Sequence, residues 1–145
     1  MTKKLWKIPT AKEYEAKLGI RNPQQRARIE SSFRTMMRPL RALLKRNAEI
    51  YYRAHKNRGP CETCAFAPRT RRRGGFLATS HGLMKSLLRQ KPFVCHANQS
   101  GHAKNEIDPK RLMVCMGFAL VAHEPKAVQA AECAHQALEQ ELRNS

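Results

Sequence analysis

Four of the five cysteines are spaced in a way that suits one metal centre. Cys61 and Cys64 form a Cys-x2-Cys pair, and Cys95 and Cys115 follow singly, 31 and a further 20 residues along the chain. Two residues between thiolates allow both sulfur atoms to bind the same ion. A phenylalanine lies near each of the three segments and would keep the centre dry. We therefore expect these four cysteines to bind a single metal centre.

Two kinds of centre fit this set. Zn²⁺ is common in small basic proteins and is slightly favoured, although it usually draws on two cysteine pairs and this chain has one. A [4Fe-4S] cluster is often held by a pair plus separate cysteines in an apolar shell. His96 is an alternative ligand or a residue that orients one, and Cys133 is interpreted as a spare thiol. The structural alternative is that Cys95 and Cys115 are small core residues.

The second chemical feature is an excess of positive charge. The chain of 145 residues has 28 Lys and Arg against 11 Asp and Glu, which gives a formal net charge of +17. Residues 1–78 carry +15 of it and residues 79–145 carry +2. Neither folding nor solubility requires such an excess, so a polyanionic partner is the first hypothesis.

Much of this charge lies on one predicted helix. Apolar residues recur at spacings of three and four from Pro23 to about His55, and Pro39 predicts either a kink or two helices that meet near Arg38. Few acids are placed to pair with its basic residues, which favours nucleic-acid contact over a merely solvated face. An arginine-rich loop that ends in Gly74 and Gly75 also suits phosphate binding. The expected nucleic-acid contacts are Arg34, Arg38, Arg41, Lys45, Arg46, Arg53, Arg71, Arg72 and Arg73.

The remaining signals are mainly helical. Thr10 with Glu13 predicts the start of a short helix over 11–18 that Gly19 ends. Ser80 is expected to cap a helix that ends near Gln90, and an apolar segment over 112–122 is expected to form a buried central helix. A last helix starts at Pro125, with its apolar stripe at Val128, Ala131, His135, Leu138 and Leu142.

These elements predict a mainly α fold. A basic helical arm, residues 1–58, leads into a helical core stapled by four cysteines, residues 59–145, the two forming one compact unit. No run approaches the roughly 18 apolar residues that a membrane span requires, and the first residues lack the apolar stretch of a signal peptide. We therefore expect a cytoplasmic protein without a membrane partner.

Three cysteine segments share a recognisable pattern, CETCAF at 61–66, PFVCH at 92–96 and CMG at 115–117. The pattern resembles a family of small cysteine-rich proteins of unassigned function from bacteriophages and mobile elements, which reads Cys-x2-Cys-Pro-Phe, Pro-Phe-x-Cys-His and Cys-Ala-Gly. Ala65 stands where the family has proline and Met116 where it has alanine. The resemblance covers about residues 60–120. It implies a shared metal-site core and a phage or prophage origin, so the protein would be located in the host cytoplasm. It implies no established activity.

The sequence shows no paired carboxylates, Ser/His/Asp set or Walker-type motif, so we expect a protein that is not an enzyme, and no small-molecule substrate is identified. The leading hypothesis is a metal-binding protein, nucleic-acid-binding or regulatory, that grips DNA or RNA phosphates, with Trp6, Tyr51 or Tyr52 stacking on bases. An alternative is an interaction module whose apolar stripe over 36–44 docks on a host machine such as RNA polymerase or a nuclease. The third is an iron–sulfur redox or oxygen sensor.

Overall fold

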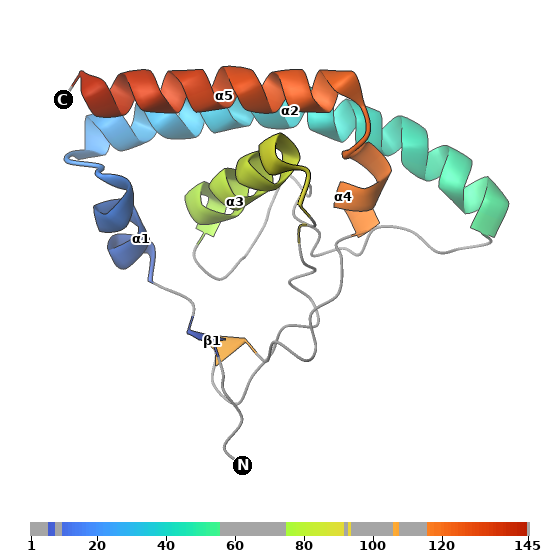
Figure 1. Ribbon diagram of the computed structural model, residues 1–145, viewed down its shortest axis with the longest axis horizontal. Coiled ribbons are helices and arrows are strands. Elements are labelled where there is room, and N and C mark those ends of the chain that lie inside the picture. Colours follow the sequence, from blue (N-terminus) through green and yellow to red (C-terminus); the bar gives the residue numbers. More distant parts are fainter. Residues whose placement is uncertain are drawn as a thin grey trace, which may run out of the picture.

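A computed structural model of the chain describes residues 6–7, 10–55, 75–91, 93, 106–107 and 116–144. Helices dominate these residues, which confirms the predicted mainly α class (Figure 1). The elements are β1 (Trp6–Lys7), α1 (Ala11–Leu18), α2 (Pro23–His55), α3 (Gly75–Arg89), β2 (Glu106–Ile107), α4 (Met116–Val121) and α5 (Pro125–Arg143).

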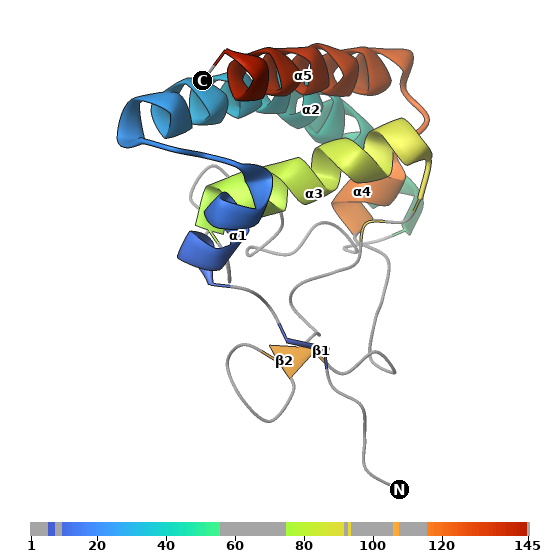
Figure 2. The same ribbon diagram turned by 60° about the vertical axis from the view of Figure 1, so that its left-hand side comes forward.

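The two short strands pair antiparallel, with Trp6 opposite Ile107. This pairing joins two segments that are far apart in the sequence (Figure 2). The sequence analysis did not predict it, because two-residue strands are too short to show an alternating pattern.

Helix α1 has the boundaries that its capping residues predict. The hydroxyl of Thr10 accepts a hydrogen bond from the backbone N–H of Glu13 at 3.2 Å. Gly19 ends the helix with a φ of +92°, and its N–H bonds to the carbonyl oxygens of Glu15 and Ala16. A left-handed residue at this position satisfies carbonyls that the helix itself leaves unpaired.

Helix α2 runs without a break through Pro39, so the alternative of two helices meeting near Arg38 is wrong (Figure 1). The buried side chains of Met37 and Leu40 flank the proline. The free energy gained by burying these side chains on one continuous helix face outweighs the loss of the backbone hydrogen bond that proline cannot donate. The side chain of Asn22 caps the start of α2 by accepting the N–H of Gln25 at 2.8 Å.

One hydrophobic core is shared by four helices. It contains Phe33 of α2, Leu83 of α3, Val121 of α4 and Ala131 of α5, and each of these side chains is almost fully buried. Helix α5 lies alongside α2 and runs in the opposite direction, with α3 beneath them (Figures 1 and 2). The apolar face of the basic helix therefore packs against the C-terminal half of the chain.

The predicted start of α3 at Ser80 is wrong. The helix begins five residues earlier, at Gly75, and Ser80 is buried inside it. Leu77 extends the buried stripe that continues through Leu83, Met84 and Leu87. Burial of this additional apolar turn explains why α3 starts earlier than predicted. Ser80, a residue type common at N-caps, here occupies the helix interior.

The last two helices follow the prediction in part. Helix α4 is the described portion of the expected central helix, with Phe118 buried, and residues 112–115 lie outside the described ranges. Helix α5 starts at Pro125 as predicted. Its buried residues are Ala127, Ala131, Ala134 and Leu138, whereas Val128, His135 and Leu142 of the expected stripe are half-buried. No helix in the described ranges has the length and apolar character that crossing a bilayer requires.

Candidate nucleic-acid interface

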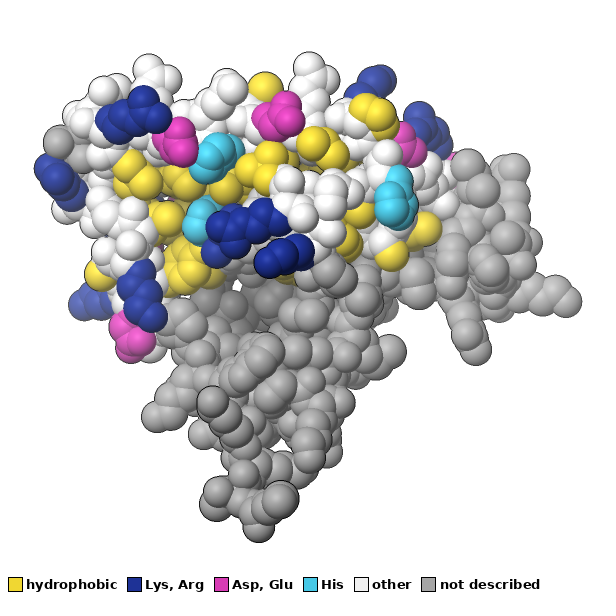
Figure 3. Space-filling view, in the orientation of Figure 1, with side chains coloured by type: hydrophobic (Ala, Val, Ile, Leu, Met, Phe, Trp, Pro, Cys, Tyr) yellow, Lys and Arg dark blue, Asp and Glu magenta, His cyan; other side chains and the backbone are white. Residues whose placement is uncertain are grey.

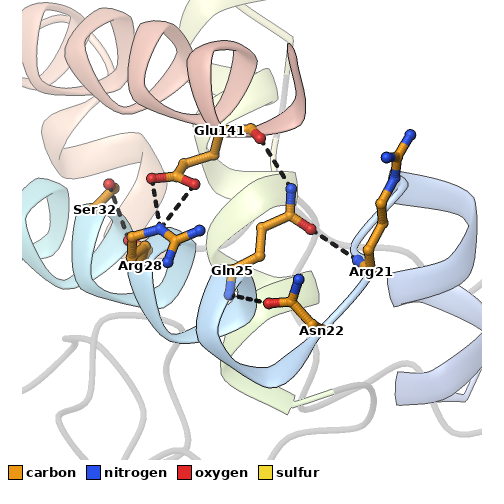
Figure 4. Close-up of polar contacts among 6 residues, drawn as sticks. All are labelled: Arg21, Asn22, Gln25, Arg28, Ser32 and Glu141. Atoms are coloured by element: carbon orange, nitrogen blue, oxygen red, sulfur yellow. Dashed lines mark hydrogen bonds and ion pairs between the residues drawn. The ribbon is translucent and has the colours of Figure 1, made fainter. Parts of the chain in front are cut away.

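Helix α2 presents three faces, and one of them is tied to α5 by ion pairs. Arg28 Nε lies 2.9 and 3.0 Å from the two carboxylate oxygens of Glu141 (Figure 4). Arg46 Nη2 lies 3.0 Å from Oε1 of Glu124, at the other end of α5. Because the helices are antiparallel, the two pairs join them near both ends. These two arginines serve the fold.

A buried amide strengthens the first of these ends. Gln25 is only 1% exposed. Its Nε2 donates to the backbone oxygen of Glu141 at 2.9 Å, and its Oε1 accepts the backbone N–H of Arg21 at 2.8 Å (Figure 4). Gln25 thus links α2, the last turn of α5 and the segment after α1, and it satisfies a carbonyl at a helix C-terminus.

A second amide acts at the other end. Asn47 Nδ2 donates to the backbone oxygen of Leu120 at 2.7 Å and to Oε1 of Glu124 at 3.1 Å. The hydrogen bond from Asn47 and the nearby charge of Arg46 lower the pKa of Glu124. The turn between α4 and α5 is therefore held against α2 by a neutral donor and a charged one.

The third face of α2 carries four cations that we call the basic stripe: Arg34, Arg38, Arg41 and Lys45. Their spacings of four, three and four place them on one helix face. Arg34, Arg38 and Lys45 are exposed, and Arg41 is half-buried. The other two faces of the helix are occupied by the core and by α5, so the stripe lies on the face that neither of them covers.

Arg34 marks the end of the stripe nearest α3. Its guanidinium carbon lies 6.0 Å from the centre of the Phe76 ring, within the range of a cation–π contact. Its Nη1 also lies 3.9 Å from a carboxylate oxygen of Glu30, one turn earlier. No acidic partner of Arg38 or Lys45 lies in the part of the chain that the structure describes.

The structure divides the predicted contact residues into three groups. Arg34, Arg38, Arg41 and Lys45 share the stripe, whereas Arg46 lies on the α5 side and pairs with Glu124. Arg53 belongs to α2, but its side chain lies outside the description, as do Arg71, Arg72 and Arg73 entirely.

The count of acids one helical turn away does not include the acids that folding brings to these basic residues. Glu124 and Glu141 of the C-terminal helix region pair with α2, and Arg26 Nε lies 3.3 Å from Oε1 of Glu15 in α1. A search for acids four residues away could not find these partners, because only folding brings them near.

The face shown in Figure 3 differs from the basic stripe in its charge pattern. Basic, acidic and apolar side chains are mixed over the described part of this face (Figure 3). The basic stripe is by contrast an array of like charges on one helix face. Its position away from both α5 and the core makes it the candidate surface for a polyanion.

The candidate metal ligands Cys61, Cys64, Cys95, Cys115 and His96 lie outside the described residues. Among the residues that are described, no group of three or more His, Cys, Asp or Glu is arranged to hold a metal ion. Cys133 is described and is an exposed free thiol on α5.

Two described phenylalanines lie close in sequence to two of these cysteines. Phe93 is two residues before Cys95, and Phe118 is three residues after Cys115. Both rings are buried, with centroids 6.4 Å apart. The structure thus brings into contact two phenylalanines that are near two of the candidate ligands in the sequence.

A further polar pair, which the sequence analysis did not single out, joins α1 to α3. Tyr14 Oη is hydrogen-bonded to His81 Nδ1. Burial raises the pKa of Tyr14 to about 12, and burial with the charges of Lys85, His135 and Arg89 lowers the pKa of His81 to about 4. At neutral pH the hydroxyl donates to an uncharged imidazole. This arrangement is a structural tie, because it lies half-buried between helices.

The apolar stripe over 36–44 does not form an open docking face. Met36, Met37, Leu40 and Leu43 are 0–6% exposed and belong to the shared core. The apolar docking face that the interaction-module hypothesis assigned to these residues is therefore wrong. Binding through this stripe would require the core to open.

Comparisons with known proteins give no match. No family model matches the chain, and no curated protein and no solved structure is significantly similar to it.

Proposed function

We propose that the chain is a metal-stabilised nucleic-acid-binding protein without enzymatic activity. The observation that carries the proposal is the basic stripe, four cations on the one face of α2 that neither the core nor α5 occupies. Basic residues arranged along a helix are the electrostatic footprint of proteins that contact phosphates.

The contact between Arg34 and Phe76 supports a single extended surface. Phe76 lies three residues after Arg73, the last arginine of the loop. In the proposed interface the arginine loop, which precedes α3 in the sequence, adds its cations at the Arg34 end of the stripe.

The packing of Phe93 against Phe118 supports the metal centre. In the sequence, Cys95 comes two residues after Phe93 and Cys115 three residues before Phe118. The contact between the two rings therefore favours one centre shared by the two cysteines, beside a buried aromatic pair. Zn²⁺ or a [4Fe-4S] cluster would hold the segments together where the core ends.

The regulatory role, phage origin and cytoplasmic location belong to the same proposal. They are supported by the resemblance of residues 60–120 to the phage and mobile-element family and by the net charge of +17. A phage-encoded regulator of this kind would act on nucleic acid in the host cytoplasm.

The first experiment combines elemental analysis, an absorbance scan of an anaerobic preparation and titration with labelled DNA and RNA. We expect one zinc or one cluster per chain, and an affinity that falls steeply as salt is raised because counterions are released on binding. A brown preparation that absorbs near about 400 nm would identify the cluster. Binding that is insensitive to salt, or no binding to DNA or RNA at low ionic strength, would overturn the proposal.

A further inference from the structure

We infer that the basic stripe binds the sugar–phosphate backbone of duplex nucleic acid without reading its sequence, an inference that rests on the proposed function. The stripe runs from Arg34 to Lys45, which corresponds to about 16 Å along a helix. Its cations project from a part of α2 that ion pairs join to the α5 region on either side of the stripe, at Arg28 and Arg46. A duplex offers a matching rigid array, with one charge per roughly 1.7 Å of axis.

The described aromatic rings favour a duplex over a single strand. Proteins that bind single strands combine charge with exposed rings on which bases stack. Phe33, Phe93 and Phe118 are buried, and the hydroxyl of Tyr14 is bonded to His81. Phe76 does adjoin the stripe, but the guanidinium of Arg34 lies over its ring. The described side chains beside the stripe thus offer no open stacking platform, and the side chains of the predicted stacking residues Trp6, Tyr51 and Tyr52 lie outside the description.

The amide side chains of α2 argue against base reading. Asn and Gln recognise adenine through paired hydrogen bonds, so an exposed amide on the stripe would indicate sequence readout. Gln25 and Asn47 are instead used within the fold, the first by Arg21 and Glu141, the second by Leu120 and Glu124. The exposed amide of Gln24 lies ten residues before the stripe begins. What remains on the stripe is positive charge, which positions a protein on phosphates, and comparison of permuted sequences tests whether its arginines also read guanine.

Two double variants with the same net charge separate the stripe from the rest of the helix. R38Q/K45Q removes two exposed cations of the stripe, and R28Q/R46Q removes the two that pair with Glu141 and Glu124. Both lower the formal charge by two, so a nonspecific effect of charge is equal in both. Circular dichroism melts show that each variant is folded at the binding temperature.

Binding is measured by fluorescence anisotropy with a labelled DNA duplex of about 20 base pairs, its permuted sequence and the isolated single strand, from about 50 to 200 mM salt. R38Q/K45Q is expected to reduce the slope of log affinity against log salt by about 1.8, because each phosphate contact contributes about 0.9. R28Q/R46Q should leave the slope within about 0.5 of the unmodified protein. Permuting the sequence should change the affinity less than about threefold, since phosphate contacts carry no sequence information.

Four outcomes would each overturn the inference while nucleic-acid binding itself persists. The first two are an equal loss of affinity in both double variants and an unchanged salt slope in R38Q/K45Q. The other two are discrimination above about tenfold between the two sequences and tighter binding of the single strand than of the duplex. Failure of the unmodified protein to bind any of the probes would instead overturn the proposed function. The two failures are therefore distinguishable in one set of titrations.

Discussion

Arg46 and Glu124 are 78 residues apart in the sequence, and their side chains form an ion pair of 3.0 Å between α2 and the start of α5. Asn47 donates to the same carboxylate from the next position. The pair explains why Arg46, which resembles its basic neighbours in sequence, is not part of the basic stripe.

The first prediction compares these two adjacent residues. Asn47→Ala should lower the free energy of unfolding by about 1–3 kcal/mol, because the backbone oxygen of Leu120 loses its half-buried donor. Arg46→Gln should cost at most about 1 kcal/mol, since the arginine side chain is 59% exposed and solvent screens the pair. Urea denaturation measures both. A larger loss for Arg46→Gln would contradict the assignment of the main tie to Asn47.

The second prediction concerns Gln25, whose amide joins three segments. Gln25→Ala should destabilise the fold by about 1–3 kcal/mol, because two backbone groups lose their partners. Gln24→Ala is the matched control, since Gln24 is exposed and its loss should change stability by less than about 0.5 kcal/mol. The comparison is made by thermal and urea unfolding, and equal effects would show that the buried amide is unimportant.

The third prediction is a loss of stability in mild acid through His81. Its folded pKa of about 4 lies below the ordinary value of 6.5, so between these values the unfolded chain binds the proton more readily. The contribution is present above pH 6.5 and is lost as the pH falls toward 4. The melting temperature should therefore drop between about pH 6.5 and 5, above the range in which most carboxylates titrate.

Replacing the titrating group tests this interpretation. His81→Gln should make the melting temperature less dependent on pH over the same interval, whatever its effect at neutral pH. The matched control is His123→Gln, at an exposed position, which should leave the pH profile unchanged. An identical pH profile for His81→Gln and the unmodified protein would exclude His81 as the source.

The fourth prediction uses two glycines with opposite roles. Gly19→Ala should destabilise the fold by about 1 kcal/mol, because Gly19 has a φ of +92° that disfavours a Cβ atom. Gly82→Ala should stabilise α3 by about 0.4–1 kcal/mol, since it removes flexibility of the unfolded chain at a helical position. The added Cβ would meet Phe93 at an ordinary 3.5 Å. Thermal melts of both variants check the signs, and effects of the same sign would contradict the argument.

The fifth prediction separates the candidate metal ligands from the spare thiol. Cys61→Ser or Cys115→Ser should abolish metal binding and unfold the core, because metal binding and folding are linked. Cys133→Ser should do neither, since this thiol is free and exposed on α5. Metal content and circular dichroism measure the outcomes. Equal behaviour of all three variants would refute the ligand assignment.

Local signals predicted the elements that depend on neighbours in sequence. Thr10 and Gly19 mark the two ends of α1, and Pro125 marks the first turn of α5. These residues are local signals because capping residues and proline act on the backbone next to them. The start of α3 could not be predicted in this way, because Ser80 resembles a cap but is buried by contacts with the rest of the core. The pairing of Trp6 with Ile107 likewise depends on folding.

The candidate site shows the same division. The concentration of basic residues in residues 1–78 and the helical spacing of 34, 38, 41 and 45 are visible in the sequence, because charge and periodicity are local properties. Which arginines of α2 pair with distant acids depends on the folded arrangement of the helices. The acids that engage Arg28 and Arg46 come from the other end of the chain, and their Coulomb attraction acts only once α5 has packed against α2.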